Sequence, residues 1–117
     1  MATFFAGQLV IADWRDGLPK EPNRVRPAVV VEDVDLFGPN YPNVLLVPFT
    51  RDAAFAMPDL SVAIEPTAEN GLAQRSFALA HGVAATSKAR VRATQSRIAP
   101  DQLLEIRRKI ALSLGLE

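Results

Sequence analysis

An arginine and a threonine at two expected strand ends are the side chains best suited to chemistry in this sequence. Arg26 stands directly before the apolar run Pro27–Val31, and Thr50 follows the run Asn43–Phe49. Arginine offers a permanently charged fork that matches phosphoryl oxygens, and threonine offers a neutral donor. Such a pair suits the attack of an RNA 2′-hydroxyl on the adjacent phosphorus, which needs no metal and no protein nucleophile. The alternative is a surface arginine and a threonine that caps its strand.

Other reactive groups are scarce. The sequence has no cysteine, which excludes disulfides, thiolate metal sites and cysteine nucleophiles. The single histidine, His81, could be a general acid or base, or it could be structural. The run Glu32, Asp33 and Asp35 could hold Mg²⁺, although acidic runs at strand ends are usually solvated. Since no glycine-rich phosphate loop, nucleophile elbow or His-Glu metal motif is present, we expect no metal and no cofactor.

Short apolar runs separated by proline and glycine predict a mainly β fold. Strands are expected at residues 8–14, 27–33, 43–49 and 60–65, with weaker candidates at 76–79 and 83–86. Pro27 is expected at the first position of its strand, where no ladder donor is lost. Residues 100–114 have the apolar spacing of an amphipathic helix, with Pro100 at its start and Gly115 to close it. Five or six strands and one helix suggest a small barrel or strongly curled sheet with the helix packed on it.

Composition and charge limit the class of protein. The 117 residues, 49% of them hydrophobic, fit one domain spanning 1–117. A net charge of +0 argues against bulk coating of nucleic acid, yet residues 1–87 carry −4 and residues 88–117 carry +4. Cations also gather in the loop 15–26, where they can engage phosphate locally. No run approaches the roughly 18 apolar residues of a membrane span, and no secretory signal is evident, so we expect a cytoplasmic protein.

The order of short motifs resembles the MazF/PemK toxins of bacterial type II toxin-antitoxin systems. That family has a glycine-led strand, an Arg-Pro-x-Val-Val strand, a strand ending Val-Pro-x-Thr, a Gly-Leu turn, a serine-bearing strand and a leucine-rich closing helix. The matching segments here are 7–13, 26–31, 47–50, 69–72, 75–76 and 100–104. No single motif is specific, but their order covers nearly the whole chain.

The resemblance implies an SH3-like barrel of five to seven strands with a C-terminal α-helix, working as a homodimer. It implies a metal-independent, sequence-specific endoribonuclease that cuts single-stranded RNA and leaves a 2′,3′-cyclic phosphate and a 5′-hydroxyl. The family's catalytic arginine and threonine fall on Arg26 and Thr50. Substrate would lie between the loop 15–24 and the loop after Thr50. A partly disordered, acidic antitoxin of the MazE/PemI kind would occupy the same groove.

Further RNA contacts are expected around this pair. Arg15, Arg24 and Arg51 could bind phosphate or remain solvated, and Trp14 could stack on a base or pack in the protein. The PemK branch carries an Arg and an Asp on the strand after the serine segment, and residues 81–86 offer neither. The resemblance therefore does not assign a residue as general base. Three carboxylates could serve, namely Asp13, Asp16 and Glu21.

Two other functions are compatible with the sequence. CcdB-type toxins share the architecture but poison DNA gyrase, an action associated with a Trp-Gly-Ile ending, whereas this chain ends Leu114-Gly115-Leu116-Glu117. The other rival is a barrel that binds RNA or an antitoxin without catalysis.

Overall fold

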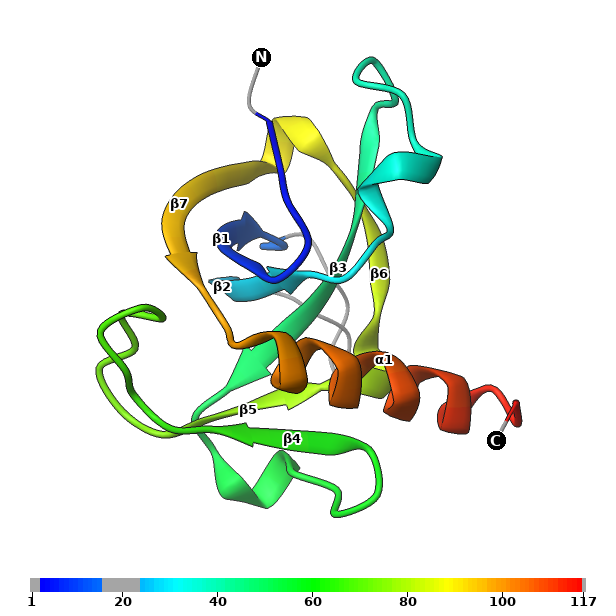
Figure 1. The fold of residues 1–117 in the computed structure, drawn as a ribbon. Helices are drawn as coiled ribbons and strands as arrows, with labels where there is room; N and C mark the ends of the chain where they lie inside the picture. The colour runs from blue at the N-terminus through cyan, green and yellow to red at the C-terminus, as the bar shows by residue number, and fades with distance from the viewer. Residues whose placement is uncertain (1–2, 16–23, 117) are drawn as a thin grey trace.

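Seven strands and one helix make up the fold in a computed structural model that describes residues 3–15 and 24–116 (Figure 1). The strands are β1 (Gln8–Asp13), β2 (Val25–Val30), β3 (Asn43–Thr50), β4 (Ser61–Ile64), β5 (Ser76–Leu79), β6 (Ala84–Ser87) and β7 (Val91–Arg97), and the helix is α1 (Pro100–Ser113). The predicted mainly β class with a C-terminal helix is confirmed. None of the described helices is long and apolar enough to cross a membrane.

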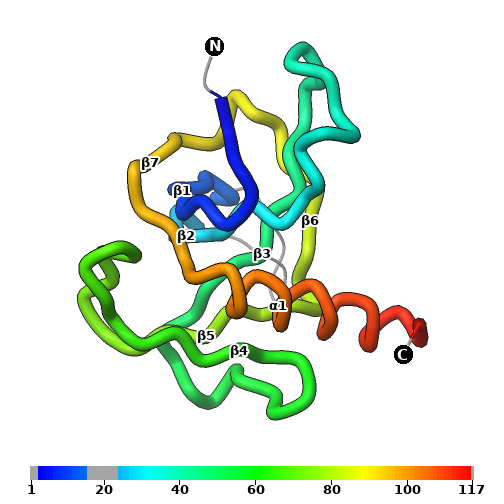
Figure 2. Tube along the Cα trace, viewed as in Figure 1, coloured from blue at the N-terminus to red at the C-terminus, as the bar shows by residue number. Residues whose placement is uncertain are grey.

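The strands form one antiparallel, strongly curled sheet. Its order is β4-β5-β3-β2-β1-β7, and β6 also pairs with β3. Within the described ranges β4 and β7 stay as separate edges, so the sheet curls without closing into a complete barrel (Figure 2). The predicted barrel is thus an open one.

Strand β3 organises the sheet because it changes partner along its length. Residues Asn43–Leu46 pair with β6, whereas Phe49 and Thr50 pair with β5. Pro48 falls between these two sets, so its missing N–H breaks neither ladder. Gly82 allows a close approach here, since a Cβ on it would lie 3.1 Å from Cγ of Pro48. The switch carries the end of β3, and Thr50 with it, away from β6 and toward β5.

The sheet separates two apolar clusters. One face of β1 and β2 places Val10, Ala12, Ala28 and Val30 in a cluster with Trp14 and Leu46. The other face places Leu9 and Val29 in a second cluster, which α1, β4 and β5 complete. Both faces are buried in the second half of β2, which explains the continuous apolar sequence there.

Helix α1 packs on the second cluster through Ile106, with Leu103 and Ile110 beside it. It ends as predicted, because Gly115 adopts a φ of +76° and the amide of Leu116 donates to the carbonyl of Ala111. The expected apolar stripe is only partly buried, since Leu104 is 61% exposed and Leu114 is 65% exposed.

Two strand predictions need correction. β2 begins at Val25, so Pro27 is its third residue and lies opposite Ile11 of β1. The sequence patterns do not predict β7 at all. It pairs with β1 along the sheet edge, and its sequence Val-Arg-Ala-Thr-Gln-Ser-Arg has apolar side chains at only two positions. A strand that covers the core with only one half-buried face needs few apolar side chains.

Candidate active site

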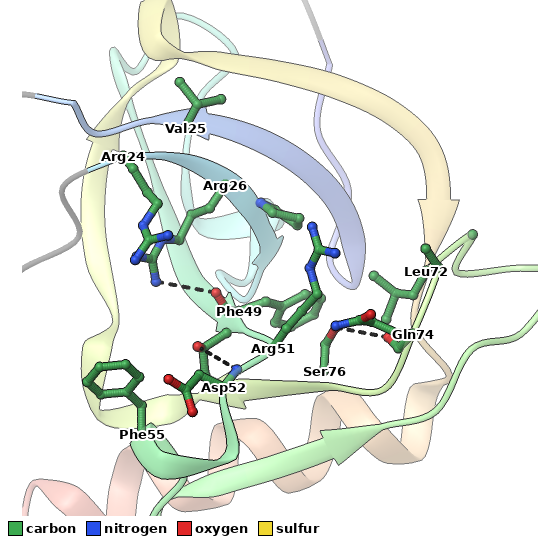
Figure 3. A pocket seen from close by; sticks show the side chains of 14 residues that line it. Arg24, Val25, Arg26, Phe49, Arg51, Asp52, Phe55, Leu72, Gln74 and Ser76 are labelled. Carbon is green, nitrogen blue, oxygen red and sulfur yellow. Dashed lines mark hydrogen bonds between the residues drawn. The ribbon is translucent and has the colours of Figure 1, made fainter.

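A pocket of about 490 Å³ opens where β2 begins and β3 ends (Figure 3). It is lined by residues 24–27, 49–52, 55, 71–74 and 76. Arg26 and Thr50 both belong to this lining, so the structure brings together the two side chains that the sequence singled out. Arg24 and Arg51 line the same pocket and add two further positive charges.

Arg26 is held by the backbone of the neighbouring strand. Its Nη1 donates to the carbonyl oxygen of Phe49 at 3.4 Å, as Figure 3 shows. Its Nε is buried and has no acceptor among the described residues. Burial and, to a lesser degree, the charge of Arg24 lower the pKa of the Arg26 guanidinium from its ordinary value. An anion bound in the pocket would oppose this lowering of the Arg26 pKa, because a negative charge nearby favours the charged guanidinium.

Proline at position 27 explains why the Phe49 carbonyl is open to Arg26. In the pairing of β2 with β3, Val30 lies opposite Leu46, and the last pair is Ala28 opposite Pro48. One step further, Pro27 would face Phe49, but Pro27 has no N–H to donate. The ladder stops there, and the guanidinium of Arg26 takes the place of the missing amide. Because Pro27 leaves the Phe49 carbonyl without a backbone donor, Arg26 can bind that carbonyl and is anchored at the pocket.

Thr50 is oriented by the turn that follows β3. Its Oγ1 accepts a hydrogen bond from the backbone amide of Asp52 at 3.2 Å. Oδ1 of Asp52 in turn accepts from the amide of Ala54 at 2.9 Å and caps the short 3-10 turn Ala53–Phe55. Because the Thr50 oxygen is an acceptor in this contact, its own proton remains available for a ligand.

Arg24 and Arg51 are exposed side chains at the mouth of the pocket. Neither side chain has a hydrogen bond or ion pair to any residue in the described ranges. With Arg26 they place three guanidinium groups around one opening, against a single lining carboxylate, that of Asp52. The pocket therefore favours anions, and a phosphodiester is an anion of suitable geometry for guanidinium donors.

Trp14 and Arg15 lie elsewhere. The indole of Trp14 is 8% exposed, and its Nε1 donates to Oγ1 of Thr86 at 3.1 Å. This position corresponds to the packing role, since a ring so buried cannot stack on a base without leaving the core. Arg15 does not line the pocket and instead forms a salt bridge of 2.7 Å with Asp13.

The candidate bases and ligands are only partly placed. Asp16 and Glu21 lie outside the described residues. The side-chain hydrogen bond from Arg15 lowers the pKa of Asp13 to about 2, which makes this carboxylate a weak base. Glu32 is buried and accepts from the amide of Leu45, and Asp33 accepts from the amide of Asp35. His81 is exposed and does not line the pocket.

Several lining residues escaped the sequence analysis, notably Asp52, Phe55 and Gln74. Ser76 belongs to the serine-bearing motif; it is buried, and its Oγ donates to the carbonyl of Gln74 at 3.1 Å. The available signal is that Asp52 lies two residues after Thr50 in the sequence. The 71–76 segment reaches the pocket only through the pairing of β5 with the end of β3.

Comparison with solved structures finds this fold in several toxins. MazF from Deinococcus radiodurans is 24% identical, with 94% of each chain covered and a TM-score of 0.76. Toxin MazF-mt6 from Mycobacterium tuberculosis is 18% identical over 94% of this chain and 98% of that one, with a TM-score of 0.70. A mycobacterial endoribonuclease in complex with its cognate antitoxin is 18% identical over 98% of both chains, with a TM-score of 0.73. At these identities the likeness establishes the fold.

Comparison at the level of sequence is more specific about the family. No curated protein matches the chain. Residues 6–114 match the family described as PemK-like, MazF-like toxin of type II toxin-antitoxin system. The match covers nearly all of the sequence, including both strands that carry the arginine pocket. The chain therefore belongs to the PemK-like, MazF-like toxins of type II toxin-antitoxin systems.

Proposed function

We propose that this toxin is a metal-independent, sequence-specific endoribonuclease that cuts single-stranded RNA. The observation that carries the proposal is the shared pocket of Arg26 and Thr50, surrounded by Arg24 and Arg51. Solved neighbours of the same fold include two structures of mycobacterial endoribonuclease, one of them in complex with its cognate antitoxin. Cleavage of RNA in cells would inhibit translation and growth.

The proposed reaction is an intramolecular transesterification. The 2′-oxygen of the nucleotide attacks its own 3′-phosphorus, while the bond from phosphorus to the 5′-oxygen of the next nucleotide breaks. The attacking hydroxyl loses a proton and the departing oxygen gains one, which yields a 2′,3′-cyclic phosphate and a 5′-hydroxyl. Negative charge grows on the phosphoryl oxygens in the transition state, so fixed donors aimed at them lower the barrier.

Arg26 and Thr50 supply these donors. The Phe49 carbonyl fixes the Arg26 side chain through Nη1, which holds the guanidinium at the pocket so that it can donate to a phosphoryl oxygen. Thr50 donates its hydroxyl proton to a second oxygen while its own oxygen accepts from Asp52. Arg24 and Arg51 hold neighbouring phosphates, while Arg15 would have to leave its salt bridge with Asp13 to contact RNA.

The pocket also suits an acidic protein segment. Solved neighbours include MazE-MazF complexes, and we propose that a MazE/PemI-like antitoxin places carboxylates against the same arginines. We further propose a homodimer, because Leu104, Leu114 and Phe55 leave apolar surface exposed on α1 and beside the pocket.

The test is cleavage of a mixed single-stranded RNA pool in EDTA, with both new ends of each product mapped. We expect cuts at a short recurrent sequence, with cyclic phosphate on one product and a 5′-hydroxyl on the other. Arg26→Ala should lower the cleavage rate by at least about a hundredfold. Arg108→Ala, which removes an exposed arginine from α1, is the matched control and should leave the rate unchanged.

Three outcomes would contradict the proposal. Products with 5′-phosphates would indicate a different reaction. RNA that is bound but never cut by the wild-type protein would favour a barrel that binds RNA without catalysis. Inhibition of purified DNA gyrase without RNA cleavage would support the CcdB-like function.

A further inference from the structure

A cross-strand row leads out of the pocket over the open end of the sheet. Pro27 of β2 lines the pocket and pairs with Ile11 of β1, and Ile11 pairs in turn with Arg92 of β7. Directly opposed residues of antiparallel strands point to the same face. Pro27, Ile11 and Arg92 therefore form one row, here called the exit row, that starts at the pocket wall and ends at the sheet edge.

The neighbouring residues establish which face this is. Val91 and Ala93, on either side of Arg92, pack against the cluster that contains Val10 and Ala12. Arg92 must point to the opposite face, because side chains alternate along a strand. On that face the Leu9–Val29 pair is buried, whereas Pro27 and Ile11 are half-buried and Arg92 is exposed. The exit row is thus the open end of a face that is otherwise covered by α1, β4 and β5.

The charge along the exit row favours a polyanion. Residues 71–100 contain five lysines and arginines and no aspartate or glutamate. The Arg92 side chain has no hydrogen bond or ion pair to any described residue, and it is exposed. Asp13, which follows Ile11 on the same face of β1, is the nearby acid, and three contacts of 2.7 to 3.2 Å from the Arg15 guanidinium neutralise it. A strand of nucleic acid that follows the row from Ile11 to Arg92 would therefore meet the Asp13 carboxylate already paired with Arg15.

We propose that the RNA on one side of the cleaved bond leaves the pocket along the exit row and that Arg92 binds one of its flanking phosphates. The inference rests on the proposed RNase function and extends it to a binding surface on β1 and β7. Two inter-strand spacings, roughly 10 Å, separate the β2 and β7 backbones, so the contact lies beyond the cleaved bond itself. Pro27 and Ile11 provide an apolar floor on which a base or ribose can rest.

Equilibrium binding of labelled RNA tests this inference. The probe is a single-stranded RNA with the cleavage sequence at its centre and a 2′-deoxy nucleotide at the cut position, so that it binds without reacting. A short form carries only the nucleotides next to the cut, and a long form extends on both sides. Affinities are measured by fluorescence anisotropy over a series of salt concentrations.

Arg92→Ala should weaken binding of the long RNA by roughly three- to tenfold and reduce the salt slope by about 0.7, the value for one phosphate contact on a single strand. Binding of the short RNA and its cleavage rate when unmodified should not change. Arg92→Lys should restore most of the affinity, because a phosphate contact needs a positive charge. Arg108→Ala is the control for the loss of one positive charge and should affect neither RNA.

The contrary results are distinct from failure of the proposed function. If wild-type protein binds and cuts RNA while Arg92→Ala matches Arg108→Ala on the long form, the exit row is wrong and Arg92 serves only to keep the edge strand from pairing with other chains. If Arg92→Ala weakens the short and long forms equally, the contact is not on a flank and the inference also fails. If the wild-type protein binds no RNA at all, both the proposed function and this inference are wrong.

Discussion

The guanidinium of Arg26 donates from Nη1 to the carbonyl oxygen of Phe49 at 3.4 Å, and this contact ties β2 to the residue before Thr50. The two proposed catalytic side chains are therefore positioned by one backbone junction. It forms because β3 leaves β6 for β5 and because Pro27 stops the β2–β3 ladder one residue early. The positions of Arg26 and Thr50 in the pocket depend on the pairing of these strands.

Replacing Pro27 with alanine tests the anchoring of Arg26. The backbone amide introduced at position 27 would face Phe49 and compete with Arg26 for its carbonyl, so the ladder should lengthen while the guanidinium loses its support. We expect kcat to fall by roughly tenfold to a hundredfold without loss of thermal stability. Hydrogen exchange should show a protected amide at position 27. An unchanged kcat with that amide protected would show that Arg26 does not depend on Phe49.

Thr50 offers a matched pair of substitutions. Thr50→Val keeps the shape but removes the donor, and kcat should fall by about 10²- to 10³-fold. Thr50→Ser keeps the hydroxyl and should retain most of the activity. Since Oγ1 also accepts from the Asp52 amide, the unfolding midpoint of each variant must be measured beside its kcat. Equal activity of the valine variant and the wild type would remove Thr50 from the mechanism.

Trp14 should matter for stability and not for RNA binding. In Trp14→Phe the hydroxyl of Thr86, which is 5% exposed, loses its indole partner. We expect a loss of about 1 to 3 kcal/mol in the free energy of unfolding by urea. RNA affinity should stay within about twofold of the wild type. A loss of affinity of roughly fivefold or more with stability intact would instead indicate that the ring stacks on a base.

The acid pH dependence of one ion pair can be tested by NMR. The hydrogen bond from Arg15 holds the pKa of Asp13 at about 2, below the ordinary value of 3.8. The folded state thus binds its proton later than the unfolded state as pH falls. The contribution of this pair to stability is present above the ordinary pKa and is lost as pH drops toward about 2.

Arg15→Ala should return the titration of Asp13 toward the ordinary value and remove this part of the pH dependence. Arg24→Ala, which removes a neighbouring charge without touching Asp13, is the control. If the wild-type carboxyl already titrates near 3.8, the pair does not form in solution. If Arg15→Ala also weakens RNA binding by more than Arg108→Ala does, Arg15 contacts RNA in addition to Asp13.

Local signals are sufficient to predict much of the fold. Proline and glycine flank β1 and β4 and precede β3, and the 100–114 periodicity predicts α1 almost to the residue. β7 escapes prediction because an edge strand with one half-covered face carries too few apolar residues to stand out. The start of β2 is predicted too late for a different reason. Proline is expected to open a strand, whereas here its missing N–H faces the end of the ladder and is tolerated there.

The candidate site likewise has features that the sequence predicts and features that it does not. The meeting of Arg26 and Thr50 in one pocket could be predicted from their strand-end positions, while their catalytic role stays a prediction. The burial of Trp14 and the salt bridge of Arg15 with Asp13 could not, since both depend on which side of β1 faces the core. The reach of residues 71–76 into the pocket and the row from Pro27 to Arg92 follow from strand order and register, which spacing along one chain does not encode.

The most direct measurement uses one RNA with and without the 2′-hydroxyl at the cut position. The toxin should bind both forms with equal affinity in EDTA, cut only the hydroxyl form, and leave a 2′,3′-cyclic phosphate beside a 5′-hydroxyl. Cleavage of the 2′-deoxy form, or a 5′-phosphate on either product, would contradict the account of Arg26 and Thr50 as donors to an RNA that attacks itself.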